Sequence, residues 1–420
     1  MPYPGFRNPD DWFTATQAAA AGGTTMVLDF IPVLKGEKHC EWLEKWEENA
    51  KTNSIIDYSF HMTIVEWTEE VREAIKRAAS HGITSVKAYL AYKGRIMLGN
   101  DNEFLQFFKF AAENGVLPMT HCEDGEIIEY LQNEYFNAGH VEPKYHPLSR
   151  PQWVEGTAAK HATALAAATK SPLYIVHNTC VDSVDVIEHA NYGAYPVFGE
   201  CTITHLTCTD ELNSDPNFDI AAGAVLSPPL RTETDRLALW SSLRRGVLNV
   251  ISTDHCPIYL KDKRRGLNDF RAIPNGCPDI EERMVLAWYY GVHAGLISPN
   301  EYVAVTSANA AKIFGCYPRK GIIAPGSDAD VVIIDPKAKR VINAATQKGA
   351  VDYTLWENLE VTGIPVVTIS HGEVVWEVEV VDDVAQYAQG KLSTQKGRGH
   401  FIGRKTFHPF VYGRQVKSEI

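Results

Sequence analysis

The segment SVKAYLAYKG, Ser85–Gly94, has the length and apolar content of a buried β-strand, but it carries a lysine at its third position. An ammonium group is costly to remove from water unless it is paired or chemically changed. Six further runs of similar character recur along the chain, at residues 24–30, 57–64, 116–123, 172–179, 195–202 and 248–255. The segment is therefore one strand of a repeating pattern, and its lysine needs an explanation.

Helical segments separate these strands. TEEVREAIKRAASHG follows the second strand, and DNEFLQFFKFAAENG ends in Asn114-Gly115, a typical helix stop. Alternating strands and helices predict a parallel sheet. We expect a TIM-like (β/α) barrel and not an open dinucleotide-binding sheet, because no GxGxxG follows the first strand and polar residues gather at strand C-terminal ends.

The pattern contains seven strands, whereas a closed (β/α)8 barrel needs eight. Ahead of residue 24 the sequence offers one helical segment, DDWFTATQAAAAGG, and no strand. Either the chain is truncated, or the barrel is completed in a way that the sequence does not show. We expect a barrel that lacks its first strand.

The barrel is expected over residues 1–318, and the character of the sequence changes after it. Short alternating strands such as DADVVIIDP and VVTISHGEVVWE predict a small β domain, part of a β-sandwich, over 319–389. The remaining residues, 390–420, mix basic, glycine and aromatic residues. We expect them to form an arm that lies on a neighbouring subunit.

Composition restricts the class of partner. The 420 residues are 45% hydrophobic and 22% charged, and the net charge of -12 argues against nucleic acid or an anionic membrane as the partner. There is no apolar run long enough to span a membrane and no signal-peptide pattern. The eight cysteines include no CxxC pair, which suits reduced thiols. We therefore expect a cytoplasmic protein with a small-molecule ligand.

Four ionisable residues stand at equivalent strand ends: Lys87, His121, His177 and Asp254. The C-terminal ends of barrel strands share one rim, so these side chains are expected to converge. Imidazoles and a carboxylate are good ligands for zinc-like ions, but an ammonium has no lone pair to give. A buried lysine has a lowered pKa and can add carbon dioxide as the neutral amine, which yields a carbamate able to bridge two cations.

Each of these residues alone has a simpler interpretation. A single strand histidine is more often a hydrogen-bonded core residue, Lys87 could extend to solvent or pair with a carboxylate, and Asp254 could cap a turn. The metal hypothesis depends on all four lying at the same end of successive strands. His61 and His205 also lie near strand ends, and we expect structural or supporting roles for both.

These motifs resemble the cyclic amidohydrolases, specifically dihydropyrimidinase and the D-hydantoinases, over essentially the whole chain. The resemblance extends beyond the metal-site motifs. The segments that carry it are SVKAYLAYKG, THCEDGEII, LYIVHNT and STDHCP, with SPPLR (227–231), AIPNG and EERM (272–284), VAVTSANAAKIFGCYPRKG (303–321) and GSDADVVIIDP (326–336).

The resemblance implies two zinc ions in the barrel mouth, bridged by carboxylated Lys87. His121 and His177 would hold the second metal, and Asp254 would bind the first and act as general base. A hydroxide between the metals would attack the ring amide, and the proton would pass to the leaving nitrogen.

Three further roles follow from the same resemblance. Tyr92 would donate to the developing oxyanion, although alone it would pass for a packed aromatic residue. Ser227 and Asn275 would hold the cyclic amide, although either alone would pass for a turn residue.

The chain departs from the family pattern at one place. The family carries a His-x-His pair at the end of its first strand, and Met1 aligns a few residues beyond that pair. Only Lys87 and Asp254 then remain for the first metal, and two protein ligands bind zinc poorly. We expect a truncated version of a competent enzyme, with weak or absent hydrolysis if the truncation is native.

The expected function is the ring opening of dihydrouracil, dihydrothymine or hydantoins by a homotetramer in pyrimidine catabolism. One alternative is a non-catalytic scaffold like the collapsin response mediator proteins, which lack the metal ligands. Another is an inactive truncated form. Allantoinase and dihydroorotase rank lower, because SPPLR, IPNG and the C-terminal region match dihydropyrimidinase more closely.

Overall fold

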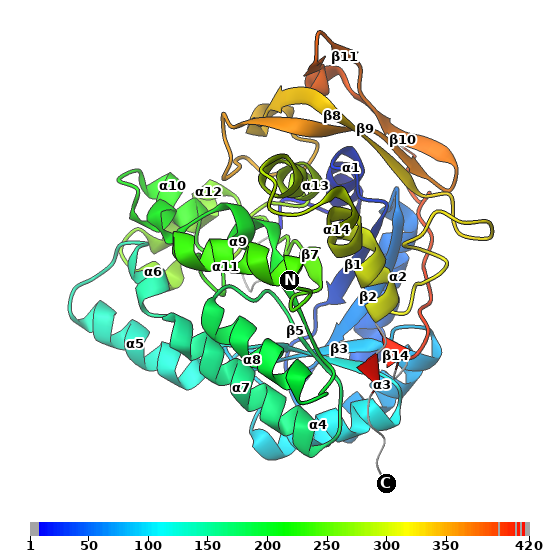
Figure 1. Cartoon of the computed structure of the whole chain (residues 1–420). Coiled ribbons are helices and arrows are strands. Elements are labelled where there is room, and N and C mark those ends of the chain that lie inside the picture. The colour runs from blue at the N-terminus through cyan, green and yellow to red at the C-terminus, as the bar shows by residue number, and fades with distance from the viewer. Residues whose placement is uncertain (1–7, 394, 408–409, 412–413, 416–420) are drawn as a thin grey trace.

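Seven parallel strands form the larger of two main sheets, and each strand pairs with the next along the chain (Figure 1). The computed structural model describes residues 8–407 except 394, and the backbone of 410–411 and 414–415. The strands are β1 (Met26–Ile31), β2 (Asp57–Thr63), β3 (Ser85–Tyr89), β4 (Leu117–His121), β5 (Leu173–Ile175), β6 (Val197–Thr202) and β7 (Val250–Ser252). All seven predicted strands, and their parallel order, are confirmed.

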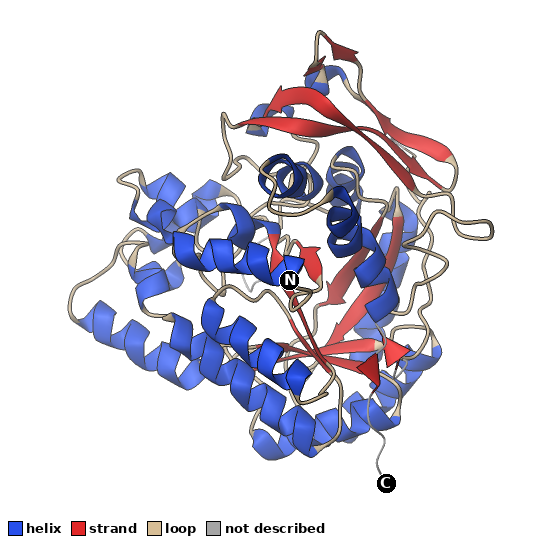
Figure 2. Ribbon diagram, viewed as in Figure 1, coloured by secondary structure: helices blue, strands red, loops and turns tan. Residues whose placement is uncertain are grey.

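Helices cover the outside of this sheet, and the second sheet forms a separate layer (Figure 2). The α-helices are α1 (Trp12–Ala21), α2 (His39–Asn53), α3 (Glu69–Ser80), α4 (Asp101–Glu113), α5 (Gly125–Asn137), α6 (Tyr145–Leu148), α7 (Gln152–Ala168), α8 (Val181–Tyr192), α9 (Ile203–Thr207), α10 (Phe218–Gly223), α11 (Glu233–Arg244), α12 (Leu260–Lys263), α13 (Arg283–Ala287), α14 (Pro299–Val303) and α15 (Asn309–Ile313). The helix begun by α13 continues as a π-helix over Trp288–His293, and that of α14 over Ala304–Ala308.

Helix α3 shows how the local sequence sets these elements. The Thr68 side chain accepts a hydrogen bond from the backbone of Val71 and caps the first turn, where Glu69 and Glu70 favour the positive end of the helix dipole. Val71, Ala74, Ile75 and Ala78 recur at helical spacing and are buried against the barrel. Gly82, at φ 96°, then turns the chain into β3.

The sheet is curled but open among the described residues, because β1 and β7 are its two ends. The edge strand β1 is half-exposed over Met26–Phe30, whereas every residue of β2, β3 and β4 is buried. The edge strand thus has a different environment from the strands that follow it. The expected TIM-like (β/α) barrel without a first strand is confirmed among the described residues.

Large side chains fill the barrel interior below the strand C-terminal ends. Met119, Tyr174 and Phe198 lie in register on β4, β5 and β6 and are all buried. Val250 of β7 and Phe314, which follows α15, belong to the same cluster. The interior is therefore a packed core and not a pore, and functional groups are left to the rim above it.

The second sheet has six strands in the order β11-β12-β8-β9-β10-β13. Gly363 of β9 (φ 90°) lies against the Trp288 ring, so closely that a Cβ atom there would come within 1.9 Å of it. Arg340 of β8 forms a buried ion pair with Glu282 beside α13. The strands are β8 (Val331–Val341), β9 (Glu360–Ser370), β10 (Glu373–Glu377), β11 (Val380–Val381), β12 (Val384–Ala385) and β13 (Lys391–Leu392). The boundaries predicted for the domains stay predictions.

The described part of the C-terminal tail lies along the N-terminal ends of its own barrel strands. The Arg404 guanidinium is buried and donates to Ser59 Oγ at 3.1 Å and Ser85 Oγ at 2.9 Å. The Phe401 ring stacks on Phe60 at 5.9 Å. Contact with a neighbouring subunit stays a prediction, and two short strands, β14 (Phe410–Val411) and β15 (Arg414–Gln415), pair antiparallel beyond this stretch.

Candidate metal centre and active site

Two of the predicted metal ligands face each other at the rim of the barrel. His121 is the last residue of β4 and His177 follows β5 by two residues; His121 Nδ1 lies 3.0 Å from His177 Nε2. Both rings are buried, and burial lowers the pKa of each below its ordinary value. Neutral imidazoles keep a lone pair for a metal, so the facing nitrogens form a suitable donor pair.

Glu123 fixes the other side of the His121 ring. Its Oε2 lies 2.8 Å from His121 Nε2 and also accepts a hydrogen bond from Arg150 Nη1 at 2.8 Å. Burial opposes ionisation of this carboxyl, but Arg150 and His121 outweigh it and lower the pKa of Glu123 to about 2. A carboxylate that holds the far nitrogen of a metal-ligating histidine orients the ring and raises its basicity.

Lys87 is buried in β3, below the histidine pair. Its Nζ lies 4.5 Å from the centre of the Phe30 ring and 5.0 Å from that of Tyr89. Burial lowers the pKa of Lys87, and the charges of Asp254 and Glu200 partly oppose this shift. The predicted lysine and aspartate are therefore near enough to influence each other.

Asp254 follows β7 by two residues and is exposed to solvent, although protein surrounds it closely. Solvent reaches its surface, whereas the protein around it is dense enough for burial to raise the pKa of the carboxyl, against the opposing charge of Lys87. Because the carboxylate is exposed, water screens it and limits the rise in its pKa. At this position Asp254 can contact both the other rim residues and a ligand that enters from solvent.

Three of the predicted site residues have left-handed backbones: Tyr92 at φ 65°, His177 at φ 39° and Asp254 at φ 64°. Such angles are uncommon for residues other than glycine and cost free energy. The three stand just past the ends of β3, β5 and β7, where the chain leaves the sheet. Strain of this kind gathers at functional sites, so the backbone supports the interpretation drawn from the side chains.

Tyr92 lies with the histidine pair. The centre of its ring is 5.2 Å from that of His121 and 6.1 Å from that of Tyr89. The side chain is half-buried, so its hydroxyl-bearing ring belongs to the rim and not to the core.

Ser227 and Asn275 are brought together as a second pair. Asn275 Nδ2 donates a hydrogen bond to Ser227 Oγ at 2.8 Å. The carbonyl of the next residue, Pro228, lies 2.9 Å from His205 Nε2, and His205 is near enough to contribute to the lowered pKa of His177. His205 therefore lies beside this pair and within electrostatic reach of His177.

Comparison with known proteins agrees with this geometry. A sequence model described as the amidohydrolase family matches residues 13–375 of the chain.

The chain belongs to the amidohydrolase family.

Within this family, the chain is similar to D-hydantoinases and to a dihydropyrimidinase. A D-hydantoinase of Rhizobium radiobacter is 39% identical over 88% of this chain and 80% of its own, and the dihydropyrimidinase of Rattus norvegicus is 38% identical over 99% of this chain and 78% of its own. Among solved structures, a D-hydantoinase from Bacillus sp. AR9 has a TM-score of 0.91 and 39% identity, covering 97% of this chain and 86% of that one. The family and fold predicted from the motifs are confirmed.

The amidohydrolase rim also contains residues that the sequence motifs did not single out. Glu123 follows His121 by two residues, a spacing that returns a side chain to the same face of an extended segment. Glu200 of β6 accepts a hydrogen bond from Tyr174 Oη at 2.8 Å and influences the pKa of Lys87. A carboxylate inside an apolar strand was the available signal for Glu200.

His61 of this amidohydrolase has a structural environment. Its Nδ1 lies 2.5 Å from Ser85 Oγ, and its ring packs 4.8 Å from that of Phe30 and 5.1 Å from that of Phe314. It is held in the core below the rim.

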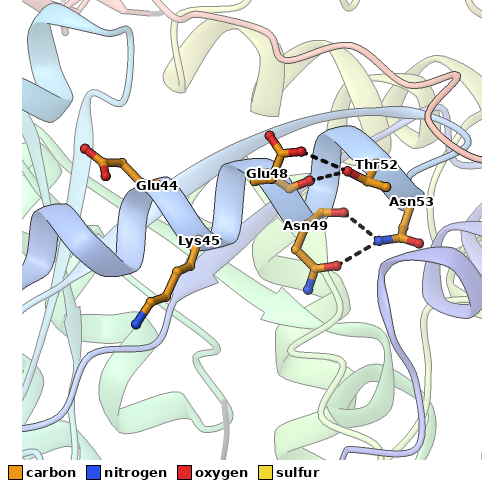
Figure 3. A pocket seen from close by; sticks show the side chains of 6 residues that line it. All are labelled: Glu44, Lys45, Glu48, Asn49, Thr52 and Asn53. Carbon is orange, nitrogen blue, oxygen red and sulfur yellow. Dashed lines mark hydrogen bonds between the residues drawn. The ribbon is translucent and has the colours of Figure 1, made fainter.

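A shallow pocket over α2 is unrelated to the amidohydrolase rim (Figure 3). It is lined by polar side chains that bond along the helix, with Thr52 Oγ1 donating to the Glu48 carbonyl at 2.8 Å and Asn53 Nδ2 to Asn49 Oδ1 at 2.9 Å. This is a solvated face of the helix. Among the described residues, no helix is both long and apolar enough to cross a bilayer.

Proposed function

We propose that this chain opens cyclic amide rings of the dihydropyrimidine or hydantoin class by hydrolysis. The observation that carries the proposal is the approach of His121 Nδ1 to His177 Nε2 beside Lys87 and Asp254. The relatives support it: the chain is 39% identical to a D-hydantoinase and 38% identical to a dihydropyrimidinase, and both names denote cyclic amide hydrolases. The substrates are 5,6-dihydrouracil, dihydrothymine or hydantoins.

The metal ions of this proposal are zinc, held at the rim. Two neutral imidazoles with facing nitrogens, one of them anchored by Glu123, fit such an ion. Lys87 lies in an apolar strand over two aromatic rings, and as a carbamate it would supply bridging oxygens with Asp254 beside it. When bound, the metals supply an activated water and polarise the amide carbonyl.

The residues of the chain then perform the remaining tasks. Water adds to the amide carbon, the C–N bond breaks, and Asp254 carries the proton from that water to the leaving nitrogen. The Tyr92 hydroxyl donates to the carbonyl oxygen as negative charge develops on it. Ser227 and Asn275, already hydrogen-bonded to each other, hold the ring amide in place.

We also propose that the enzyme is a cytoplasmic homotetramer. All eight cysteines are free, and six of them are buried, which suits a reducing compartment. The tetramer rests on the resemblance to the family, and sedimentation velocity of the purified chain would test it.

The decisive experiment measures bound metal and ring opening together. The purified chain is loaded with Zn²⁺ and assayed with dihydrouracil and with hydantoin, beside His177→Ala and a control, His161→Ala, on the exposed face of α7. We expect turnover in the parent and the control, slow because Lys87 and Asp254 are only two ligands for the first metal, and none in His177→Ala. A zinc-loaded parent that opens neither ring, or an active His177→Ala, would contradict the proposal.

A further inference from the structure

A second group of metal-type side chains lies at the N-terminal end of the strands, away from the rim. Asp57 begins β2, His371 stands in the turn between β9 and β10, and His400 belongs to the C-terminal tail. Asp57 Oδ1 lies 2.7 Å from His371 Nε2, and His400 Nδ1 lies 3.2 Å from His371 Nε2 and 3.5 Å from Asp57 Oδ1. Three segments far apart in sequence thus bring three ligand atoms to one point.

The separations within the cluster are those of hydrogen bonds and are also close to those of a metal ligand set. Asp57 Oδ1 also accepts a hydrogen bond from the His400 backbone nitrogen at 2.9 Å, so three nitrogens converge on one carboxylate oxygen. Ligand bonds of 2.0–2.1 Å in a tetrahedral site place neighbouring donor atoms about 3.3 Å apart. The separations of 3.2 and 3.5 Å match that value. The 2.7 Å between Asp57 Oδ1 and His371 Nε2 would have to increase by about 0.6 Å.

The charges around the cluster accept a cation. Asp57 Oδ2 is bonded to Lys320, which also contacts Asp328 and Asp330, and Arg319 pairs with Asp328. Three carboxylates therefore face two fixed positive charges, which leaves one negative charge uncompensated. The ammonium occupies the other oxygen of Asp57, so the oxygen that faces the two imidazoles remains available.

Backbone hydrogen bonds hold both histidine-bearing segments in place. The His371 backbone N–H donates to Asp330 Oδ1 at 2.9 Å and fixes the turn, in which His371 has φ 52°. The His371 side chain is 25% exposed and that of His400 is 63% exposed. An ion from solvent can therefore reach a site whose carboxylate is buried.

We propose that Asp57, His371 and His400 bind one divalent transition metal ion such as Zn²⁺, with water completing the tetrahedron. The site is separate from the rim and independent of the hydrolytic reaction. Its ion would tie the C-terminal tail and the β9–β10 turn to the first residue of β2, so its role is to hold the tail on the barrel.

Equilibrium dialysis with Zn²⁺ alone tests the proposal on the full chain. The double variant His371→Asn/His400→Ala removes both imidazoles, and asparagine tolerates the left-handed backbone at 371. We expect it to bind one equivalent of Zn²⁺ fewer than the parent. The matched control is His161→Asn, because His161 is an exposed histidine that pairs with one carboxylate, Asp101 at 2.8 Å, and has no second imidazole among its described partners.

Two further measurements separate a site from adventitious binding. Zn²⁺ should raise the melting temperature of the parent and of His161→Asn more than that of the double variant, since a ligand that binds the folded state stabilises it. Anomalous diffraction at the zinc edge should place a peak among the three side chains. Equal Zn²⁺ stoichiometry in parent and double variant, or a crystal in Zn²⁺ without that peak, would overturn the proposal.

Discussion

Replacing Glu123 by glutamine tests whether the histidine pair is a metal site. The carboxylate accepts hydrogen bonds from His121 and Arg150, both at 2.8 Å, and its own side chain is fully buried. Glutamine keeps the shape but removes the charge, and hydrogen bonds to a charged group are about twice as strong as neutral ones. Loss of such an orienting partner lowers metal affinity about 10- to 100-fold, or about 1.4–2.7 kcal/mol.

The same change breaks a buried ion pair, so stability must be measured separately. Leaving Arg150 without its carboxylate costs about 3–5 kcal/mol of unfolding free energy. Glu155→Gln is the matched control, because Glu155 is equally buried and pairs with Arg231 at 3.0 Å but does not contact His121 or His177.

Zn²⁺ affinity is measured by chelator competition, and stability by urea unfolding of the metal-free chains. We expect both variants to lose stability and only Glu123→Gln to lose affinity. Parent-like affinity in Glu123→Gln, or an equal loss in both variants, would refute the reasoning.

Three other predictions follow from buried charges. Arg340→Met leaves Glu282 unpaired in the interface with the second sheet and should lower the unfolding free energy by about 3–5 kcal/mol in urea; a loss below about 1 kcal/mol would contradict this. Burial and the charge of Glu282 raise the pKa of Glu281 to about 7, so the folded state holds that proton longer than the unfolded one, and stability falls as pH rises from about 4.5 to 7. Glu281→Gln should flatten that part of the pH profile, and an unchanged slope would argue against the shift. Lys87→Ala should abolish Zn²⁺ binding at the rim and ring opening, as read by metal analysis and turnover, whereas an active variant would exclude the carbamate bridge.

The sequence predicted the strands well because each is a short buried run bounded by helix stops. It also predicted that His121 and His177 would meet, since the C-terminal ends of neighbouring parallel strands share one rim. The approach of the two ring nitrogens could not be predicted, because His177 has a left-handed backbone, a conformation that only a few per cent of residues other than glycine adopt.

Other parts of the structure lay beyond sequence reasoning for a different reason. The cluster of Asp57, His371 and His400 joins a strand start, a hairpin turn and a tail that are more than 300 residues apart at the extremes, and no spacing rule connects them. The burial of Arg404 against the barrel was equally hidden, because a tail rich in basic residues and glycine suggests a surface arm.

The left-handed backbone angles at Tyr92, His177 and Asp254 lower the stability of the fold at the positions where we place the reaction. Each such residue costs on the order of 1 kcal/mol, so together they hold a few kcal/mol that the rest of the fold must supply. Glycine at any of the three would relax the chain and also remove a side chain to which we assign a catalytic or metal-binding role. A descendant that no longer needed turnover could gain folding stability by substitution at these three positions. A thermostable but inactive relative should therefore have glycines there.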